Sequence, residues 1–143
     1  MAGHLLTVDQ LKTSFYTKFG EVKAVRGVSF TLDKGEILGI VGESGSGKSV
    51  TAYSIINLLD YPGRIKGGHV IYDGKEITGL PAKKMQKIRG KEIGVIFQDP
   101  MTSLNPVYTI GNQMSEIIRY HLGLNRSDAR ARVMELLVSV GIS

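Results

Sequence analysis

Residues 36–50 constrain the fold more than any other stretch of the sequence. They read as an apolar run, Ile37–Val41, then a glycine-rich turn, then the start of a segment with helical spacing. The turn matches the pattern G-x-x-x-x-G-K-[ST] through Gly42, Gly47, Lys48 and Ser49. A strand followed by such a loop and a helix is the context in which the pattern binds nucleotide phosphates. The stretch therefore predicts an α/β unit with a phosphate-binding loop.

Each residue type in this loop has a physical role. The glycines allow backbone angles that residues with a Cβ avoid, so successive N–H groups can surround an anion at a helix N-terminus. Lys48 adds a positive charge for the outer phosphates, and the Ser49 hydroxyl can bind Mg²⁺. The residues expected to bind nucleotide here are Gly42, Glu43, Ser44, Gly45, Ser46, Gly47, Lys48, Ser49 and Val50.

Length and composition limit the chemistry of the chain. It has 143 residues, enough for one domain with a real core, and no cysteine, which excludes disulfides and thiolate metal sites. No apolar run approaches the ~20 residues of a membrane-spanning helix, and the N-terminus lacks a signal-peptide pattern, so a cytoplasmic location is expected. The net charge of +5 owes much to residues 83–91. No aromatic residues interleave with these charges, so no nucleic-acid partner is expected.

Upstream of the loop, the sequence predicts two strands. The first is expected at His4–Val8, and the second at Val22–Leu32, which alternates as a half-buried strand does. Asp33–Gly35 is expected to be a turn. Ile37–Val41 is nearly continuous apolar sequence, as in a central parallel strand covered on both faces.

Downstream of the loop, the pattern changes from helix to strand. Residues 69–77 read as a hairpin that turns at Asp73-Gly74. Glu92–Phe97 is expected to be a further buried strand. It would place Gln98 at its C-terminal end, where open α/β sheets bind ligands.

Four helices are expected between and after these strands. The helix after the loop should end at residues 60–63, and Pro81–Arg89 reads as a short basic helix. A last helix should begin near Asn125 or Ser127 and stop at Gly141. The apolar positions of the helix after the loop are Ala52, Ile55, Ile56 and Leu59. The two final helices carry, at helical spacing, Ile110, Met114, Ile117, Ile118 and His121, and then Ala129, Val133, Leu136, Leu137 and Val140.

The aromatic residues Phe15, Tyr16 and Phe19 precede the loop in a polar segment. One of them could stack on a nucleotide base, because every base presents a π-face. Alternatively, they pack on the sheet. The residues alone favour neither interpretation.

Two long runs carry a resemblance to a known family. Gly39–Ser49 and the run from Ile96 to Pro106, Ile-Phe-Gln-Asp-Pro-Met-Thr-Ser-Leu-Asn-Pro, resemble the ATP-binding subunits of ABC transporters. Within that family they are most similar to dipeptide, oligopeptide and nickel importer ATPases. The resemblance covers essentially the whole chain.

The resemblance implies roles for individual residues. Gly42–Ser49 would be the Walker A loop, which binds ATP with Mg²⁺, and Gln98 would be the Q-loop glutamine. Lys48 and Gln98 are then the expected catalytic residues, and Ser49 and Gln98 the metal ligands. Phe15 or Tyr16 would be the aromatic that stacks on adenine, with Val25 near the base.

The resemblance also implies a fold and partners. The fold would be an ABC-type P-loop NTPase core with an antiparallel β subdomain at residues 1–109, and the beginning of a helical subdomain at 110–143. The partners would be membrane subunits, reached through the Q-loop region, and a second ATP-binding subunit in a homo- or heterodimer. The subunit would lie in the cytoplasm, peripheral on the inner face of the cell membrane.

The same resemblance marks what the sequence lacks. The signature motif, the Walker B strand and the switch histidine of the family are absent from residues 1–143, so the chain looks truncated. We therefore expect it to bind ATP, as part of a subunit that energises dipeptide or oligopeptide import, without hydrolysing ATP alone. The alternatives are nickel import and a non-hydrolytic interaction fragment.

Overall fold

The structure is a computed structural model that describes residues 3–99 and 103–142. Residues 100–102 of the Ile96–Pro106 run lie outside the described residues. The chain divides into two compact units, residues 1–86 and 87–143, and each is described by itself.

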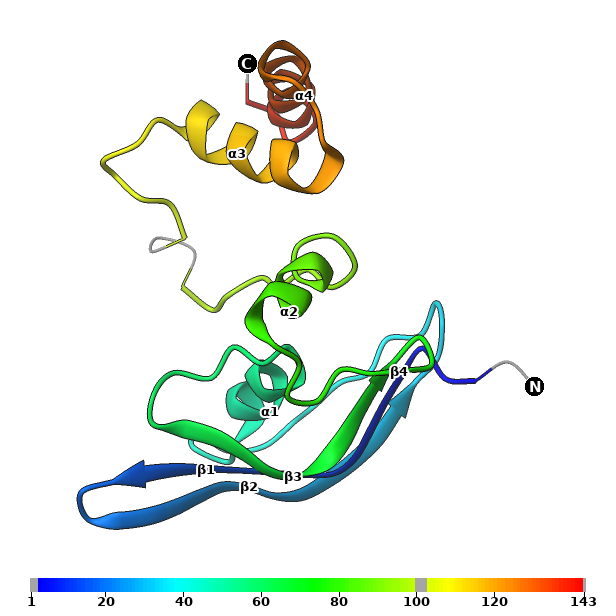
Figure 1. The fold of residues 1–143 in the computed structure, drawn as a ribbon, viewed down its shortest axis with the longest axis vertical. Helices are drawn as coiled ribbons and strands as arrows, with labels where there is room; N and C mark the ends of the chain where they lie inside the picture. The colour runs from blue at the N-terminus through cyan, green and yellow to red at the C-terminus, as the bar shows by residue number, and fades with distance from the viewer. Residues whose placement is uncertain (1–2, 100–102, 143) are drawn as a thin grey trace. The chain divides into compact units, whose positions relative to one another are not determined.

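The first unit is built on a four-stranded antiparallel sheet (Figure 1). Its strands are β1 (Leu6–Thr17), β2 (Gly20–Leu32), β3 (Gly63–Tyr72) and β4 (Lys75–Glu76). The order is β2-β1-β3-β4, so β1 pairs along its length with both β2 and β3. The predicted hairpin is confirmed, since Asp73 and Gly74 join β3 to β4 with positive φ angles of 46° and 72°. The predicted strand at Val22–Leu32 and the turn at Asp33–Gly35 are also confirmed.

The first strand is much longer than the predicted segment His4–Val8. Its second half alternates between two kinds of side chain: Leu11 and Thr13 are buried, while Lys12 is exposed. Residues two apart on a strand share a face. The sequence reads as polar here because Thr13 and Ser14 are polar, although both are buried.

One helix, α1 (Lys48–Ile55), covers the buried face of the sheet (Figure 1). The predicted apolar face of this helix is only partly right. Ile56 is buried, but Ala52 is exposed, and the fully buried positions within the helix are Thr51 and Ser54. The helix thus meets the sheet through hydroxyl groups as well as through apolar atoms. The short basic helix predicted at Pro81–Arg89 is confirmed as α2 (Ala82–Ile88).

Two predicted buried strands are absent from the described residues. Ile37–Val41 and Glu92–Phe97 have no regular secondary structure apart from a single parallel bridge between Arg89 and Ile93. Ile37 is 96% exposed and Ile96 is 99% exposed. A fully apolar strand needs hydrogen-bonded neighbours and a layer on each face. No strand among residues 3–99 and 103–142 pairs with either run. The apolar character of the two runs is therefore not enough to make them strands.

The second unit contains two packed helices, α3 (Ile110–Leu122) and α4 (Arg126–Ser139). Both N-termini are capped by side chains: Thr109 accepts a hydrogen bond from the N–H of Asn112, and Asn125 accepts one from that of Asp128. The helices pack around Ile118, Ala129 and Val133. The predicted cap at Asn125 is confirmed, and so is the stop at Gly141, which has φ +83° just beyond the helix.

Candidate functional site

The glycine-rich loop takes a conformation that only glycines fit at its key positions. Gly47 has φ +94° and is the N-cap of α1. A Cβ on Gly47 would lie 2.6 Å from the carbonyl oxygen of Ala24 on β2, and one on Gly42 would lie 2.6 Å from Ser46 Oγ. The loop therefore passes directly over β2 and closes tightly on itself.

The loop curls around the ammonium group of Lys48. Its Nζ donates hydrogen bonds to the carbonyl oxygens of Gly42 and Glu43, both at 2.7 Å, and a longer one of 3.4 Å to Ser46 Oγ. These three acceptors face the inside of the loop. The positive charge thus lies at the centre of the concave backbone, where an anion could take over the contacts that the carbonyls now make.

Backbone donors at the start of α1 complete the anion-binding surface. Among the described residues, no hydrogen bond satisfies the N–H groups of Lys48, Ser49 or Val50. The N-cap residue, Gly47, has no side chain to accept from them. Three free donors and the positive end of the helix dipole therefore meet the Lys48 ammonium at one place, an arrangement that suits phosphate oxygens.

Ser49 is the oxygen donor of this site that fits a magnesium ion. Its side chain is exposed, and no hydrogen bond to it occurs among the described residues. The described part of the chain contains no group of three or more His, Cys, Asp or Glu side chains that could hold a metal. Mg²⁺ keeps several waters and often binds through one or two protein oxygens together with substrate phosphates. A single hydroxyl beside a phosphate site is consistent with that mode of coordination.

Hydroxyl contacts hold the start of α1 together and join the helix to the sheet. Thr51 donates to the carbonyl of Gly47 through both Oγ1, at 2.9 Å, and its N–H, at 2.8 Å. On the next turn, the buried hydroxyls of Thr13 on β1 and Ser54 lie 2.8 Å apart. Sequence reasoning missed these positioning residues. The only signal would have been two hydroxyl residues, three positions apart, in a helix predicted to be apolar on one side.

The two candidate aromatic residues lie on opposite faces of the sheet. Thr13 faces α1, and Phe15, two residues further along β1, shares that face. Tyr16 points to the other face, where its hydroxyl donates to Glu21 Oε1 at 3.3 Å and Lys66 Nζ lies 5.2 Å from its ring centre. Only Phe15 is on the side of the phosphate loop.

The other predicted site residues divide between the units. A Cβ on Gly47 would lie 3.8 Å from Val25 Cγ2, so Val25 is beside the loop. Phe19 is 90% exposed in the turn between β1 and β2. Gln98 belongs to the second unit and is exposed. No helix among the described residues has the length and apolar character needed to cross a membrane.

A family model described as ABC transporter matches residues 25–143. Among curated relatives, the oligopeptide transport ATP-binding protein OppD of Bacillus subtilis (strain 168) is 53% identical over 139 residues, which are 96% of this chain and 39% of OppD. The dipeptide transport ATP-binding protein DppD of Escherichia coli (strain K12) is 45% identical over 138 residues, 96% of this chain and 42% of DppD. The chain thus spans about two fifths of the length of these relatives.

Solved structures with the same fold include two states of one bacterial cassette. A dimeric bacterial ABC transporter cassette superposes with a TM-score of 0.77 at 24% identity, over 92% of this chain and 55% of the cassette. A post-hydrolysis state of that ATP-binding cassette, bound to ADP and Pi, gives 0.78 at the same identity and coverage. At this identity the likeness shows the fold alone. The expected ABC-type P-loop fold is thereby confirmed.

Proposed function

This chain belongs to the ABC transporter family, and we propose that it binds ATP as part of a subunit that energises the import of dipeptides or oligopeptides. The observation that carries the proposal is the set of phosphate-binding groups at the start of α1. The Lys48 ammonium and three unpaired N–H groups converge there on one concave loop. Such a loop can hold several phosphate oxygens by charge-assisted hydrogen bonds, each contributing roughly 1.5–3 kcal/mol.

The residues of this chain have distinct roles in the proposed complex. The N–H groups of residues 48–50 and the Lys48 ammonium bind and orient the phosphates. Ser49 would help to hold Mg²⁺, which supplies neutralisation of phosphate charge when bound. Phe15 stacks on adenine because it lies on the loop side of the sheet, and Val25 lines the same region.

The partners and location follow from the kind of subunit proposed. A second ATP-binding subunit would complete the nucleotide site, and membrane subunits would bind near Gln98. The subunit would then lie at the inner face of the cell membrane. The relatives named above are peptide transporters, which supports peptides over nickel as the cargo. Residues 1–109 would form the nucleotide-binding core, and residues 110–143 would begin the helical subdomain.

We expect binding without efficient hydrolysis from the 143 residues themselves. The sequence contains no Ser-Gly-Gly segment and no apolar strand ending in Asp-Glu. It therefore supplies neither an opposing signature nor a carboxylate positioned to activate water. Positioning and charge neutralisation are the parts of phosphoryl transfer that the chain provides.

The direct test is a calorimetric titration of the purified chain with Mg-ATP. We expect Lys48→Ala to weaken binding by about 100-fold, because it removes the charge at the centre of the loop. Lys83→Ala, which removes an exposed positive charge from α2, is the matched control and should change the Kd less than about twofold. An unchanged Kd in the Lys48 variant would contradict the proposed phosphate site.

A second candidate function rests on the exposed apolar runs. Ile37, Val41 and Ile96 are each more than nine-tenths exposed, which suits association with another chain. Thermal unfolding with Mg-ATP separates the two functions, because a ligand that binds only the folded state must raise the Tm. A Tm that does not respond to Mg-ATP, together with self-association in sedimentation velocity, would favour the interaction fragment.

A further inference from the structure

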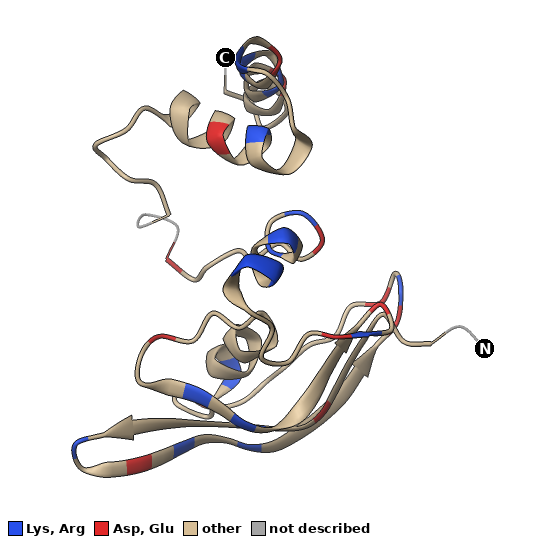
Figure 2. Cartoon of the chain, viewed as in Figure 1, with Lys and Arg blue, Asp and Glu red and all other residues tan. Residues whose placement is uncertain are grey.

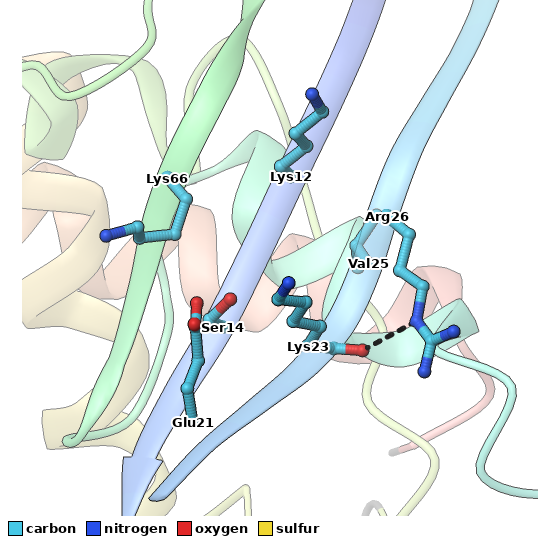
Figure 3. Close-up of a pocket in the computed structure, with 7 residues that line it drawn as sticks. All are labelled: Lys12, Ser14, Glu21, Lys23, Val25, Arg26 and Lys66. Atoms are coloured by element: carbon cyan, nitrogen blue, oxygen red, sulfur yellow. Dashed lines mark hydrogen bonds between the residues drawn. The ribbon is translucent and has the colours of Figure 1, made fainter.

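A second charged hollow lies on the sheet face that α1 does not cover. It has a volume of about 550 Å³ and is open to solvent (Figure 3). The side chains that carry the argument come from three neighbouring strands: Lys12 and Ser14 from β1, Glu21, Lys23 and Arg26 from β2, and Lys66 from β3. Lys12 and Ser14 alternate with Leu11 and Thr13, which face α1. These charged and polar side chains are therefore on the face opposite α1, whereas Val25, which also lines the hollow, pairs with Thr13 and lies beside the loop.

The hollow carries an unbalanced positive charge. Four of its side chains are cations and one is a carboxylate, and Figure 2 shows the basic positions along these strands. Among the described residues, none of the four cations forms an ion pair with an Asp or Glu. Lys12 and Arg26 are also direct cross-strand partners. Like charges at directly opposed positions destabilise a strand pair, so a bound anion would relieve this repulsion.

The one carboxylate is held in place by neighbours. Glu21 accepts a hydrogen bond from the hydroxyl of Tyr16 at 3.3 Å. A hydrogen bond from Ser14, opposed by slight desolvation and aided by the charge of Lys23, keeps the pKa of Glu21 below its usual value. The contact of Lys66 with Tyr16 raises the pKa of that ammonium. Both shifts favour the charged forms of Glu21 and Lys66.

The spacing of the strands indicates the chemical class of the ligand. Neighbouring strands lie about 4.8 Å apart, so side chains rooted on β2 and β3 start about 10 Å apart across β1. One phosphate group is too small to contact both rows, whereas a chain of linked phosphates can. A hollow of this volume is also in the range that small-molecule sites occupy.

We propose that this hollow, named here the basic face, binds a soluble small molecule that carries two or more linked phosphate groups. The hollow borders the phosphate loop through Val25, which lines the hollow and lies beside Gly47, but none of its four cations belongs to the loop. The proposal does not depend on the function proposed above. No aromatic ladder accompanies the cations, which disfavours a nucleic acid as the occupant.

Inorganic tripolyphosphate is the probe for the test, used by calorimetry on the purified chain. The Lys48→Ala background weakens the phosphate loop by about 100-fold, so changes in binding caused by variants of the hollow report the basic face. We expect the triple variant Lys12→Gln/Lys23→Gln/Lys66→Gln to lower this affinity by at least about tenfold. The matched control Lys83→Gln/Lys84→Gln/Lys87→Gln removes the same charge from α2 and should change the affinity less than about twofold.

A variant that is expected to raise the affinity serves as a control, because a loss of binding in the triple variant could also come from misfolding. Glu21→Gln removes the only carboxylate that lines the basic face and should tighten tripolyphosphate binding several-fold. Single inorganic phosphate should bind far more weakly than tripolyphosphate. Three results would overturn the proposal: no binding in the Lys48→Ala background, an equal loss in the α2 control, or binding to vesicles that contain phosphatidylglycerol with none to tripolyphosphate.

Discussion

Replacing the two buried hydroxyls between β1 and α1 should reveal an asymmetric and strongly coupled pair. Ser54 Oγ donates to the carbonyl of Val50 at 2.6 Å, which commits its only hydrogen. Thr13 Oγ1, 2.8 Å away and fully buried, must therefore be the donor to Ser54. The geometry therefore makes Thr13 the donor and Ser54 the acceptor of this hydrogen bond.

The expected loss of unfolding free energy in each variant depends on which hydroxyl group is left unpaired. Thr13→Val keeps the shape and leaves Ser54 bonded to Val50, so it should cost about 1 kcal/mol of unfolding free energy. Ser54→Ala leaves the Thr13 hydroxyl buried without an acceptor and should cost about 2 kcal/mol, after a small gain in helix propensity. The double variant removes both hydroxyls and should cost about 1.5 kcal/mol. The coupling between the two sites is then about 1.5 kcal/mol.

Urea unfolding followed by circular dichroism measures all three variants against the parent chain. The transitions should shift in midpoint with an unchanged m value, because the surface exposed on unfolding stays the same. Costs that add within about 0.5 kcal/mol would refute the reasoning. A Thr13→Val variant less stable than Ser54→Ala would refute the assignment of donor and acceptor.

Three further predictions concern other parts of the first unit. Phe15→Ala should weaken Mg-ATP binding about tenfold in calorimetry, whereas Tyr16→Ala should leave it within about twofold; equal losses would contradict their placement on opposite faces. Gly68→Ala should destabilise the chain in urea by about 3 kcal/mol, because φ is +88° and a Cβ would collide with the backbone of β1. The control Gly74→Ala, with φ +72° and open space, should cost only about 1 kcal/mol. A hydrogen bond from Thr78 lowers the pKa of Glu76 below 4.5, so its contribution to stability is present above pH 4.5 and is lost as pH falls through the lowered pKa. Unfolding curves of Glu76→Gln should therefore be less sensitive to acid than those of the parent chain.

The sequence predicts the parts of this fold in which a few adjacent residues decide the geometry. Asp73-Gly74 closes a two-residue hairpin because both positions need positive φ. Asn125 caps α4 with its own side chain, and Gly141 follows the end of that helix. The phosphate loop belongs to the same class, since Gly47 is required by its own φ angle and by the carbonyl of Ala24. In each case the deciding contact is local or is specified by a glycine.

Other features depend on contacts between residues that are distant in sequence. Ile37–Val41 and Glu92–Phe97 have the apolar character of buried strands, but a strand exists only where another strand pairs with it. For the aromatic residues, the spacing from Leu11 favours Phe15 over Tyr16 only slightly, because the two are adjacent and similar. The Thr13–Ser54 contact, across 41 positions of sequence, separates them by fixing which face of β1 meets α1.

The alternation of β1 has a consequence for how this segment can change in length. Phe15 belongs to the loop side of the sheet, and Tyr16 to the basic face. Deleting one residue between Thr13 and Phe15 would reverse the faces of every later residue in the strand, placing a tyrosine over the loop and a phenylalanine among the cations. A deletion of two residues would preserve the faces. Length variation in the regular part of this strand should therefore preserve the faces only in even steps, whereas an odd step would need a bulge such as the irregularity between Val8 and Leu11.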